Sequence, residues 1–291
     1  MRRSMLALLA AALAACASPP DEGGERFPTP EDYPPGVMEH VQFTEGGPDG
    51  WRLNSLRTPA RPDAPWRIVV ITGTPSWPDF WAPTLAAAPE NREMIVVTRP
   101  GFERSEPDHA VENIARQAEA IAPVLEGPPG QRVVLMGQSF GGPVATLLAA
   151  AHPERVGALV LVSGFFGERG PTADRLLTVG RFMRPLLPRD FRNSYLEVRA
   201  QRPQLPVVRA ALNGLTIPVV FIHGDRDTFV PLAAAERLAG ATGHPLIVAP
   251  GGDHFLNACC VAQNLAAVEQ AIALAERADA PAPPLTQAAT P

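Results

Sequence analysis

Six apolar runs of four to six residues recur along the middle of the chain and predict buried β-strands. Between them, apolar residues recur at the three- and four-residue spacing of helices. The runs are continuous rather than alternating, as expected of strands covered by helices on both faces. The pattern therefore predicts an α/β fold with a mostly parallel, doubly wound sheet. These strands are expected at residues 66–71, 93–98, 133–136, 157–162, 217–222 and 246–249.

Two further strands are expected before this series, at residues 41–44 and 51–57, because a turn cluster at 46–50 separates them. Helices are expected wherever the spacing changes to the helical period. Their predicted ranges are 78–88, 109–125, 143–151, 232–241 and 255–278.

The alternation of strands and helices stops between residues 165 and 215. Leu176, Leu177, Val179 and Phe182 follow a helical spacing there, among many arginines. This much apolar surface needs cover, so we expect a short helical cap at about 165–215 over the carboxyl edge of the sheet. The alternative is a long solvated excursion.

The two ends of the chain differ from its middle. Residues 1–15 combine a charged start with a short apolar run, the layout of a signal peptide, and the run is too short to span a bilayer. Residues 16–36 are rich in proline and acidic residues and are expected to form a tether, and 280–291 a disordered tail. The folded domain is therefore expected at 37–279.

The segment Leu13-Ala14-Ala15-Cys16 resembles the lipobox of bacterial lipoproteins. The resemblance implies cleavage before Cys16 and acylation of that cysteine. The protein would then be lipid-anchored in the bacterial cell envelope, on the outer membrane facing the periplasm in a Gram-negative source. The alternative is an ordinary secretory signal with Cys16 incidental, which gives a secreted or periplasmic protein.

Composition excludes several classes of function. The net charge of -5 and the lack of a basic cluster after the first residues argue against a nucleic-acid partner. Every one of the 25 basic residues is an arginine. Without lysine the chain cannot form a Schiff base or a Ser-Lys dyad.

The run Gly137-Gln138-Ser139-Phe140-Gly141-Gly142 joins a predicted strand to a predicted helix. A serine at the apex of such a turn exposes its hydroxyl above the carboxyl end of the strand. Nucleophilic attack on a carbonyl is the chemistry that suits it. The G-x-S-x-G pattern alone is weak in a glycine-rich chain, so the neighbouring loops must supply the rest of a site.

A serine nucleophile needs a base, and the base needs an orienting carboxylate. His254 follows the last predicted strand, so it can reach the carboxyl edge of the sheet. Asp227 lies in the turn after the strand before it, with Asp225 and Asp253 as rivals that would instead cap turns. The other histidines are weaker candidates for the base: His223 has a structural setting, and the rest are His40, His109, His152 and His244.

An oxyanion hole needs two backbone N–H donors. Phe140 supplies one because it follows the serine at a helix start. Thr74, in the loop Thr72-Gly73-Thr74-Pro75 after the strand at 66–71, is the candidate for the other. This catalytic set calls for no metal and no organic cofactor.

The order Ser139, Asp227, His254 on such a sheet resembles the α/β-hydrolase superfamily, and the match covers about residues 40–278. The resemblance implies a serine hydrolase that cleaves an ester or related acyl bond of a small-molecule substrate through an acyl-enzyme. Thr72 departs from the histidine that many members have at this point of the oxyanion loop. The alternatives are hydrolysis of a carbon–carbon bond or an amide by the same triad, and a non-enzymatic envelope binding protein on this fold.

Aromatic residues gather near the predicted strand ends. The ones expected to line an apolar acyl pocket are Trp77, Trp81, Phe102, Phe165 and Phe229. Cys259 and Cys260 adjoin each other in the last predicted helix, where we expect them to be small apolar residues rather than a metal site or a disulfide.

Overall fold

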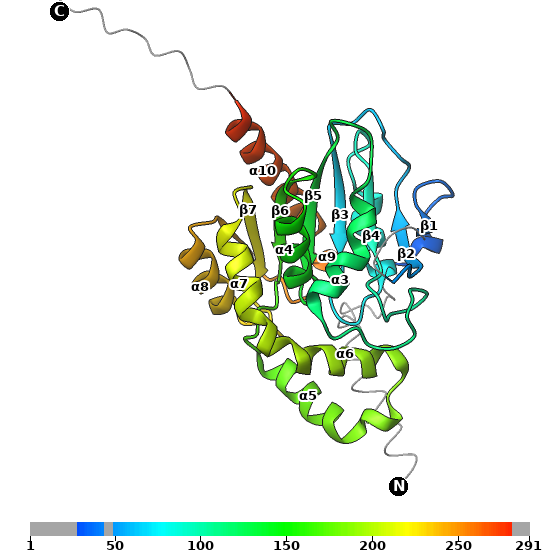
Figure 1. Cartoon of the computed structure of the whole chain (residues 1–291), viewed down its shortest axis with the longest axis vertical. Helices are drawn as coiled ribbons and strands as arrows, with labels where there is room; N and C mark the ends of the chain where they lie inside the picture. The colour runs from blue at the N-terminus through cyan, green and yellow to red at the C-terminus, as the bar shows by residue number, and fades with distance from the viewer. Residues whose placement is uncertain (1–27, 44–48, 281–291) are drawn as a thin grey trace, which may run out of the picture.

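The computed structural model describes residues 28–43 and 49–280, and a twisted sheet runs through the middle of this part (Figure 1). The strand order is β1-β2-β4-β3-β5-β6-β7-β8. Strand β2 is antiparallel to both of its neighbours, and the strands from β4 to β8 are parallel. The predicted doubly wound sheet is therefore confirmed. The strands are β1 Glu39–Phe43, β2 Leu53–Arg57, β3 Trp66–Ile71, β4 Met94–Val97, β5 Arg132–Gln138, β6 Val156–Val162, β7 Val219–Gly224 and β8 Leu246–Ala249.

Helices cover both faces of the sheet. One face carries α3 (Ile114–Ile121), α4 (Gly141–Ala151), α7 (Leu205–Gly214) and α8 (Leu232–Thr242), and the other carries α2 (Ala82–Ala86), α9 (Leu256–Cys259) and α10 (Val261–Asp279). Strands connected by helices that cross over in this way must run parallel. The short 3₁₀ turns are η1 Pro30–Asp32, η2 Pro78–Trp81, η3 Ala122–Leu125, η4 Arg184–Leu186 and η5 Arg202–Gln204.

Strand β3 shows how the two cores are divided. Val69 and Ile71 point into the core under α3 and α4, whereas Ile68 and Val70 point into the core under α10. All four side chains are fully buried. Each such side chain stabilises the fold by about 1.5–3 kcal/mol relative to an exposed one. The continuous apolar run in the sequence thus reflects a strand that is covered on both sides.

The helix predicted at 109–125 begins later than its apolar spacing indicates. Asn113 is the N-cap of α3, and its side chain accepts a hydrogen bond of 3.0 Å from the Arg116 N–H. Val111 is buried ahead of the helix, and its carbonyl accepts a hydrogen bond from Gln117. A cap that satisfies a free N–H of the first turn sets the start of a helix more sharply than hydrophobic spacing does.

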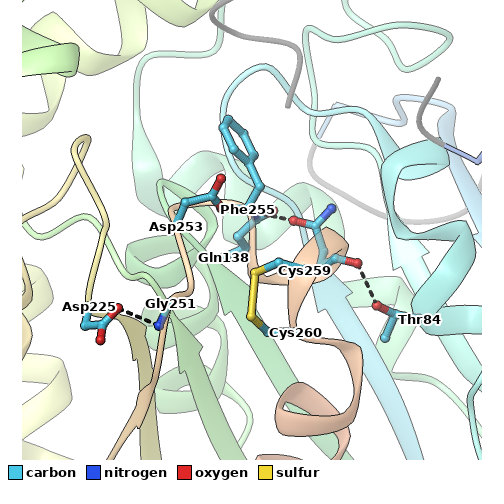
Figure 2. Close-up of a disulfide and its surroundings, with 9 residues drawn as sticks. Thr84, Gln138, Asp225, Gly251, Asp253, Phe255, Cys259 and Cys260 are labelled. Carbon is cyan, nitrogen blue, oxygen red and sulfur yellow. Dashed lines mark hydrogen bonds between the residues drawn. A yellow bond between two sulfur atoms is a disulfide. The ribbon is translucent and has the colours of Figure 1, made fainter. Parts of the chain in front are cut away.

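The helix predicted at 255–278 is divided into α9 and α10 at Cys260. The prediction for the two cysteines is wrong at this point, because Cys259 and Cys260 form a disulfide with each other (Figure 2). Cys260 has φ -134° and ψ 42°, outside the helical region. A covalent link between adjacent side chains holds the backbone in this non-helical form, so the helical ladder has to restart at Val261.

Helices α5 (Pro171–Met183) and α6 (Arg189–Gln201) lie in the segment where the cap was expected, below the carboxyl edge of the sheet in the view of Figure 1. Helix α7, at the end of that segment, belongs to the body of the domain instead. Val208 and Leu212 of α7 are fully buried in the core beside α4. The helical part of the cap is therefore shorter than the range of 165–215, because α7 has an apolar face that the core covers.

Several predictions concern residues outside the described ranges. These are the signal peptide at 1–15, Cys16, most of the tether at 16–36, most of the turn cluster at 46–50 and nearly all of the tail at 280–291. Within the predicted tether, η1 is capped by Thr29. Across residues 28–43 and 49–280, no helix has both the length and the apolar character to cross a membrane.

Candidate active site

Ser139 lies on a sharp turn between β5 and α4. Its φ is +49°, a left-handed conformation that is rare for a residue with a side chain. Three backbone hydrogen bonds hold it there: Ser139 N–H donates to Val162, and the Ser139 carbonyl accepts from Phe165 and Gly142, at 2.9, 2.9 and 3.0 Å. Backbone strain of this kind persists only where the surroundings enforce it, and here it raises the hydroxyl above the strand end.

Gly141 allows this turn to approach β3. A Cβ atom at this position would collide with the carbonyl oxygens of Ile71 and Thr72. The second glycine of the G-x-S-x-G pattern is thus required because the turn at Ser139 lies so close to β3.

The structure brings Ser139, His254 and Asp227 into one hydrogen-bonded line. His254 Nε2 lies 3.0 Å from Ser139 Oγ, and His254 Nδ1 lies 2.7 Å from Asp227 Oδ2. An ionised carboxylate accepts hydrogen bonds and cannot donate them, so the proton of a neutral imidazole has to be on Nδ1. Nε2 is then left with a lone pair facing the serine hydroxyl. This arrangement can remove a proton from Ser139.

The imidazole of His254 is held between aromatic rings. Phe229 stacks on it with a centroid distance of 4.8 Å and an interplanar angle of 23°, and Phe255 meets it edge-on at 5.5 Å. His254 is also buried. These contacts fix the plane of the ring, so that both nitrogens keep their directions toward Ser139 and Asp227.

The Asp227 carboxylate is fully buried and well supplied with donors. Its Oδ1 accepts the backbone N–H groups of Phe229 and Val230, each at 2.8 Å. Burial alone would raise the pKa of Asp227, but the nearby charge of His254 and the hydrogen bonds from His223, His254 and Val230 outweigh it. The pKa of Asp227 therefore lies well below its ordinary value, and the group is ionised throughout the neutral range.

His223 contributes to this carboxylate site, a role that the sequence did not reveal. Its Nε2 lies 2.9 Å from the Val230 carbonyl and 3.2 Å from Asp227 Oδ2. Because both partners are acceptors, Nε2 carries a proton and donates to them. The sequence predicts a structural role for His223. Its contacts show that it supports the Asp227 carboxylate and the turn that ends at Val230.

The rival acids cap turns instead. Asp225 Oδ1 accepts the Gly251 N–H and Asp253 Oδ1 accepts the Phe255 N–H, both at 2.7 Å (Figure 2). Among the other histidines, His40 pairs with Asp79 at 3.1 Å, and His109 is exposed. Hydrogen bonding to Asp79 is the main reason why the pKa of His40 is raised.

The loop after β3 lies very close to the turn that carries Ser139. A Cβ on Gly73 would come within 2.9 Å of Ser139 Cβ, so only glycine fits here without a shift of the backbone. Within the described residues, the backbone N–H groups of Thr74 and Phe140 have no hydrogen-bond acceptor. Two free donors beside the nucleophile are the arrangement that an oxyanion hole needs.

Thr72, the departure noted in the sequence, has its own set of hydrogen bonds. Its hydroxyl pairs with the Ser76 hydroxyl and lies 3.1 Å from the Val97 carbonyl. Ser76 in turn accepts the Arg99 N–H at 2.8 Å. The loop is therefore supported by a buried pair of hydroxyl groups, those of Thr72 and Ser76.

Arg99 is the second support of this loop, a role that the sequence pattern does not predict. Its guanidinium donates to the carbonyls of Thr72 and Gly73 at 2.8 and 2.7 Å. The same group pairs with Glu197 of α6 and also donates to Gln117 of α3. Arg99 thus connects the oxyanion loop to a cap helix through hydrogen bonds that are closed to water.

An apolar cavity of about 190 Å³ opens above Ser139 and His254. None of the described residues that line it is an arginine, aspartate or glutamate. Four of the five aromatic residues predicted for the pocket, Trp77, Trp81, Phe165 and Phe229, lie in this wall. The cap contributes Leu176, Leu177, Val179 and Leu187, all within its predicted apolar pattern. It also contributes residues that the sequence did not single out: Ala173, Gly180, Phe191, Tyr195 and Val198.

The prediction that Phe102, the fifth of these residues, lines the pocket is wrong. Its side chain is fully buried, and the Arg99 guanidinium lies over its ring at 4.8 Å. Phe140 receives the same cation on its ring at 4.9 Å. Phe102 therefore packs beneath the buried charge rather than facing the cavity, because a desolvated guanidinium is stabilised between two aromatic faces.

Among the described residues, no group of three or more histidine, cysteine, aspartate or glutamate side chains is arranged to hold a metal ion.

Comparison with known proteins places this geometry in a family. The chain is 31% identical over 211 residues to the biotin biosynthesis bifunctional protein BioHC of Teredinibacter turnerae, and the match covers 56% of this chain but only 36% of that protein's length. It is 27% identical over 236 residues to a pimeloyl-[acyl-carrier protein] methyl ester esterase of Nitrosomonas europaea, covering 68% of this chain and 84% of the relative.

The fold also matches solved structures. The 2-hydroxy-6-oxo-6-phenylhexa-2,4-dienoate hydrolase of Rhodococcus sp. strain RHA1 superposes with a TM-score of 0.64 at 20% identity, over 81% of this chain and 99% of that one. The sequence profile of the Alpha/beta hydrolase family matches residues 68–270. That range includes Ser139, Asp227 and His254, so this chain belongs to the α/β hydrolase family and is a hydrolase.

Proposed function

We propose that the protein is a serine hydrolase that cleaves a carboxylic ester or related acyl bond through an acyl-enzyme formed on Ser139. The observation that carries the proposal is the line of hydrogen bonds from Ser139 Oγ through His254 to Asp227, at 3.0 and 2.7 Å. A neutral imidazole oriented in this way is the base that a serine hydroxyl requires.

In the first half of the reaction, Ser139 Oγ bonds to the acyl carbon and its proton passes to His254 Nε2. The carbonyl oxygen becomes an oxyanion beside the free N–H groups of Thr74 and Phe140. The bond to the leaving alcohol then breaks, and the alcohol takes the proton from Nε2. Asp227 stays ionised and stabilises the imidazolium that forms between these two transfers.

In the second half, water gives a proton to His254 Nε2 and attacks the acyl carbon. The bond to Ser139 Oγ breaks, the serine recovers its proton from Nε2, and a carboxylic acid leaves. No electron transfer is involved, so the residues of the triad and one water molecule balance the reaction.

The cavity wall supports a substrate with an uncharged, apolar acyl group. Its aromatic and aliphatic side chains offer no cation to a carboxylate, and the chain contains no lysine that could supply one. Burying an unpaired carboxylate in such a wall is unfavourable. The relatives include both an esterase and hydrolases of carboxylate-bearing dienoates, so the preference for an ester rests on the uncharged wall of the cavity.

The sequence Leu13-Ala14-Ala15-Cys16 further supports a location in the bacterial cell envelope. In this proposal Cys16 carries the lipid anchor, and the acidic, proline-rich segment after it separates the hydrolase domain from the membrane. Metabolic labelling with a palmitate analogue tests it: wild type should be labelled, and Cys16→Ser should not.

Ser139→Ala tests the proposed reaction, with Ser163→Ala as its matched control. Ser163 is also a buried serine with positive φ (+46°) at the end of a strand, but it makes no hydrogen bond to His254. Short-chain aryl esters should be hydrolysed by wild type and Ser163→Ala. Ser139→Ala should lose activity by about 10³-fold or more while melting normally.

A fluorophosphonate probe gives an independent reading, since it bonds to an activated serine without a specific acyl group. Labelling is expected in wild type and Ser163→Ala and absent in Ser139→Ala. Full ester hydrolysis by folded Ser139→Ala would refute the mechanism. A folded wild type that neither reacts with the probe nor cleaves any ester would instead favour a binding protein on a hydrolase fold.

A further inference from the structure

An exposed apolar ridge runs along the outer side of the cap. Val179, Phe182 and Leu186 lie in one stretch of α5 and η4 and are 44%, 74% and 63% exposed. Their spacing places them on neighbouring turns. Among the described residues, the only other large apolar side chains this exposed are Val207 and Val248, which are distant from each other in sequence. In Figure 1, α5 lies outermost, with α6 between it and the sheet.

An arginine groove adjoins the ridge. Arg181, Arg184 and Arg199 line it together with Phe182 and Tyr195. None of the three guanidinium groups pairs with a carboxylate in the described part of the chain. Two of them lie over aromatic rings instead: Arg181 over Phe182 at 5.9 Å and Arg199 over Tyr195 at 5.5 Å. The groove therefore presents free cations next to exposed apolar side chains.

The cap carries a local excess of positive charge, although the chain as a whole has a net charge of -5. Residues 171–204 contain seven arginines and three acidic residues. Each of those acids is already paired with an arginine: Asp174 with Arg169, Asp190 with Arg189, and Glu197 with Arg99. The three arginines of the groove are thus free to meet an external anion.

We propose that the ridge and the groove together form a surface that docks on an anionic phospholipid membrane. We call it the cap face, and its residues are Val179, Arg181, Phe182, Arg184, Leu186 and Arg199. The apolar side chains enter the boundary between headgroups and acyl chains, and the guanidinium groups pair with lipid phosphates. Helical apolar residues flanked by arginines are typical of helices that lie in a membrane surface.

The cap face adjoins the catalytic cavity. Two residues belong to both. Val179 lines the cavity and is part of the exposed ridge, and Tyr195 lines the cavity and the groove. Docking by this face would hold the cavity against the lipid and would not depend on an anchor at Cys16. An apolar substrate dissolved in the bilayer would then have a short path to Ser139.

Vesicle co-sedimentation of the full chain tests the charge requirement. The triple variant Arg181→Gln, Arg184→Gln, Arg199→Gln removes the groove cations. Its control makes the same change in net charge elsewhere. The substitutions are Arg61→Gln and Arg92→Gln, which precede β3 and β4, and Arg277→Gln near the end of α10. We expect wild type and the control to bind phosphatidylcholine–phosphatidylglycerol vesicles alike, with the groove variant weakened by about tenfold or more.

Hydrogen exchange gives a local reading that an N-terminal anchor cannot produce. Amides of residues 176–187 should exchange more slowly with the phosphatidylglycerol vesicles than with pure phosphatidylcholine, and Phe182→Ser should remove this difference. Equal exchange in the two lipids, or equal loss of binding in both triple variants, would overturn the proposal. Protection of this segment by a soluble acidic protein but not by vesicles would also overturn it, in favour of a protein partner.

Discussion

Arg99 and Glu197 form a closed ion pair between the oxyanion loop and the cap. Their side chains are 0% and 1% exposed, and two hydrogen bonds of 2.7 and 2.8 Å join the guanidinium to the carboxylate. Of the remaining guanidinium donors, two bind the carbonyls of Thr72 and Gly73 and one binds the Gln117 side chain. The position of a cap helix and the position of the oxyanion donors are therefore set by the same side chain.

Breaking this pair should affect both folding and catalysis. Glu197→Leu leaves the Arg99 cation buried without a partner, which we expect to lower the free energy of unfolding by about 3–5 kcal/mol. The double variant Arg99→Met, Glu197→Leu should recover part of that loss, because it removes the unpaired buried cation, while the carbonyls of Thr72 and Gly73 still lose their donors. Urea denaturation measures both effects.

The double variant also separates structure from positioning. If Arg99 holds the oxyanion loop in position, kcat of the folded double variant should remain about tenfold or more below wild type, with KM less affected. Wild-type kcat in a stable double variant would show that the pair acts on folding alone.

Asp227→Asn should lower kcat by about 10³- to 10⁴-fold, because an amide can stabilise neither the required tautomer of His254 nor its positive charge. Asp225→Asn is the matched control, since Asp225 lies two residues earlier and bonds the Gly251 N–H instead of a histidine. We expect the control to remain within a few-fold of wild type. A comparable loss in both variants would mean that the turn, rather than the Asp227 charge, matters.

Gly73→Ala should impair catalysis more than folding. The new Cβ would lie 2.9 Å from Ser139 Cβ, so the oxyanion loop or the turn at Ser139 must shift. A shift of a few tenths of an ångström disturbs donors aimed at a transition state, and we expect kcat to fall by about tenfold to a hundredfold. Gly214→Ala, whose Cβ meets nothing within 4 Å, should leave kcat unchanged. Steady-state kinetics and thermal melting distinguish the two variants.

Glu103→Gln should make the stability less sensitive to pH. Burial, with added repulsion from Asp79 and Asp190, raises the pKa of Glu103 to about 7. The folded state therefore holds this proton more tightly than the unfolded state, and wild type loses stability as pH rises from about 4.5 through 7. We expect Glu103→Gln to have little effect on the melting temperature at low pH and to raise it at pH 8. A parallel shift at all pH values would contradict the assignment.

The features predicted correctly from the sequence are local ones. The predicted strand at 66–71 coincides with β3, because an apolar run interrupted only by Arg67 and flanked by turn residues allows few other structures. Ser139, Asp227 and His254 come together because each follows a strand of one parallel sheet, and the carboxyl ends of such strands share an edge.

The features that the sequence did not reveal depend on contacts between distant residues. The partner of Arg99 lies 98 positions away in the cap, and no periodicity links the two. Its place after a strand predicts Phe102 in the pocket, but its ring packs in the core against the buried Arg99 cation. The break at Cys260 depends on a bond between two side chains that a helical pattern treats as ordinary apolar positions.

The cap enters the chain between β6 and β7, after the nucleophile and before the acid and the base. Asp227 and His254 therefore remain 27 residues apart however the cap changes in length or sequence. Natural variation can replace α5 and α6, and with them part of the cavity wall, while Asp227 and His254 keep their spacing. In this architecture the cap side of the cavity and the catalytic residues can change separately, except at Glu197, which joins the cap to the oxyanion loop through Arg99.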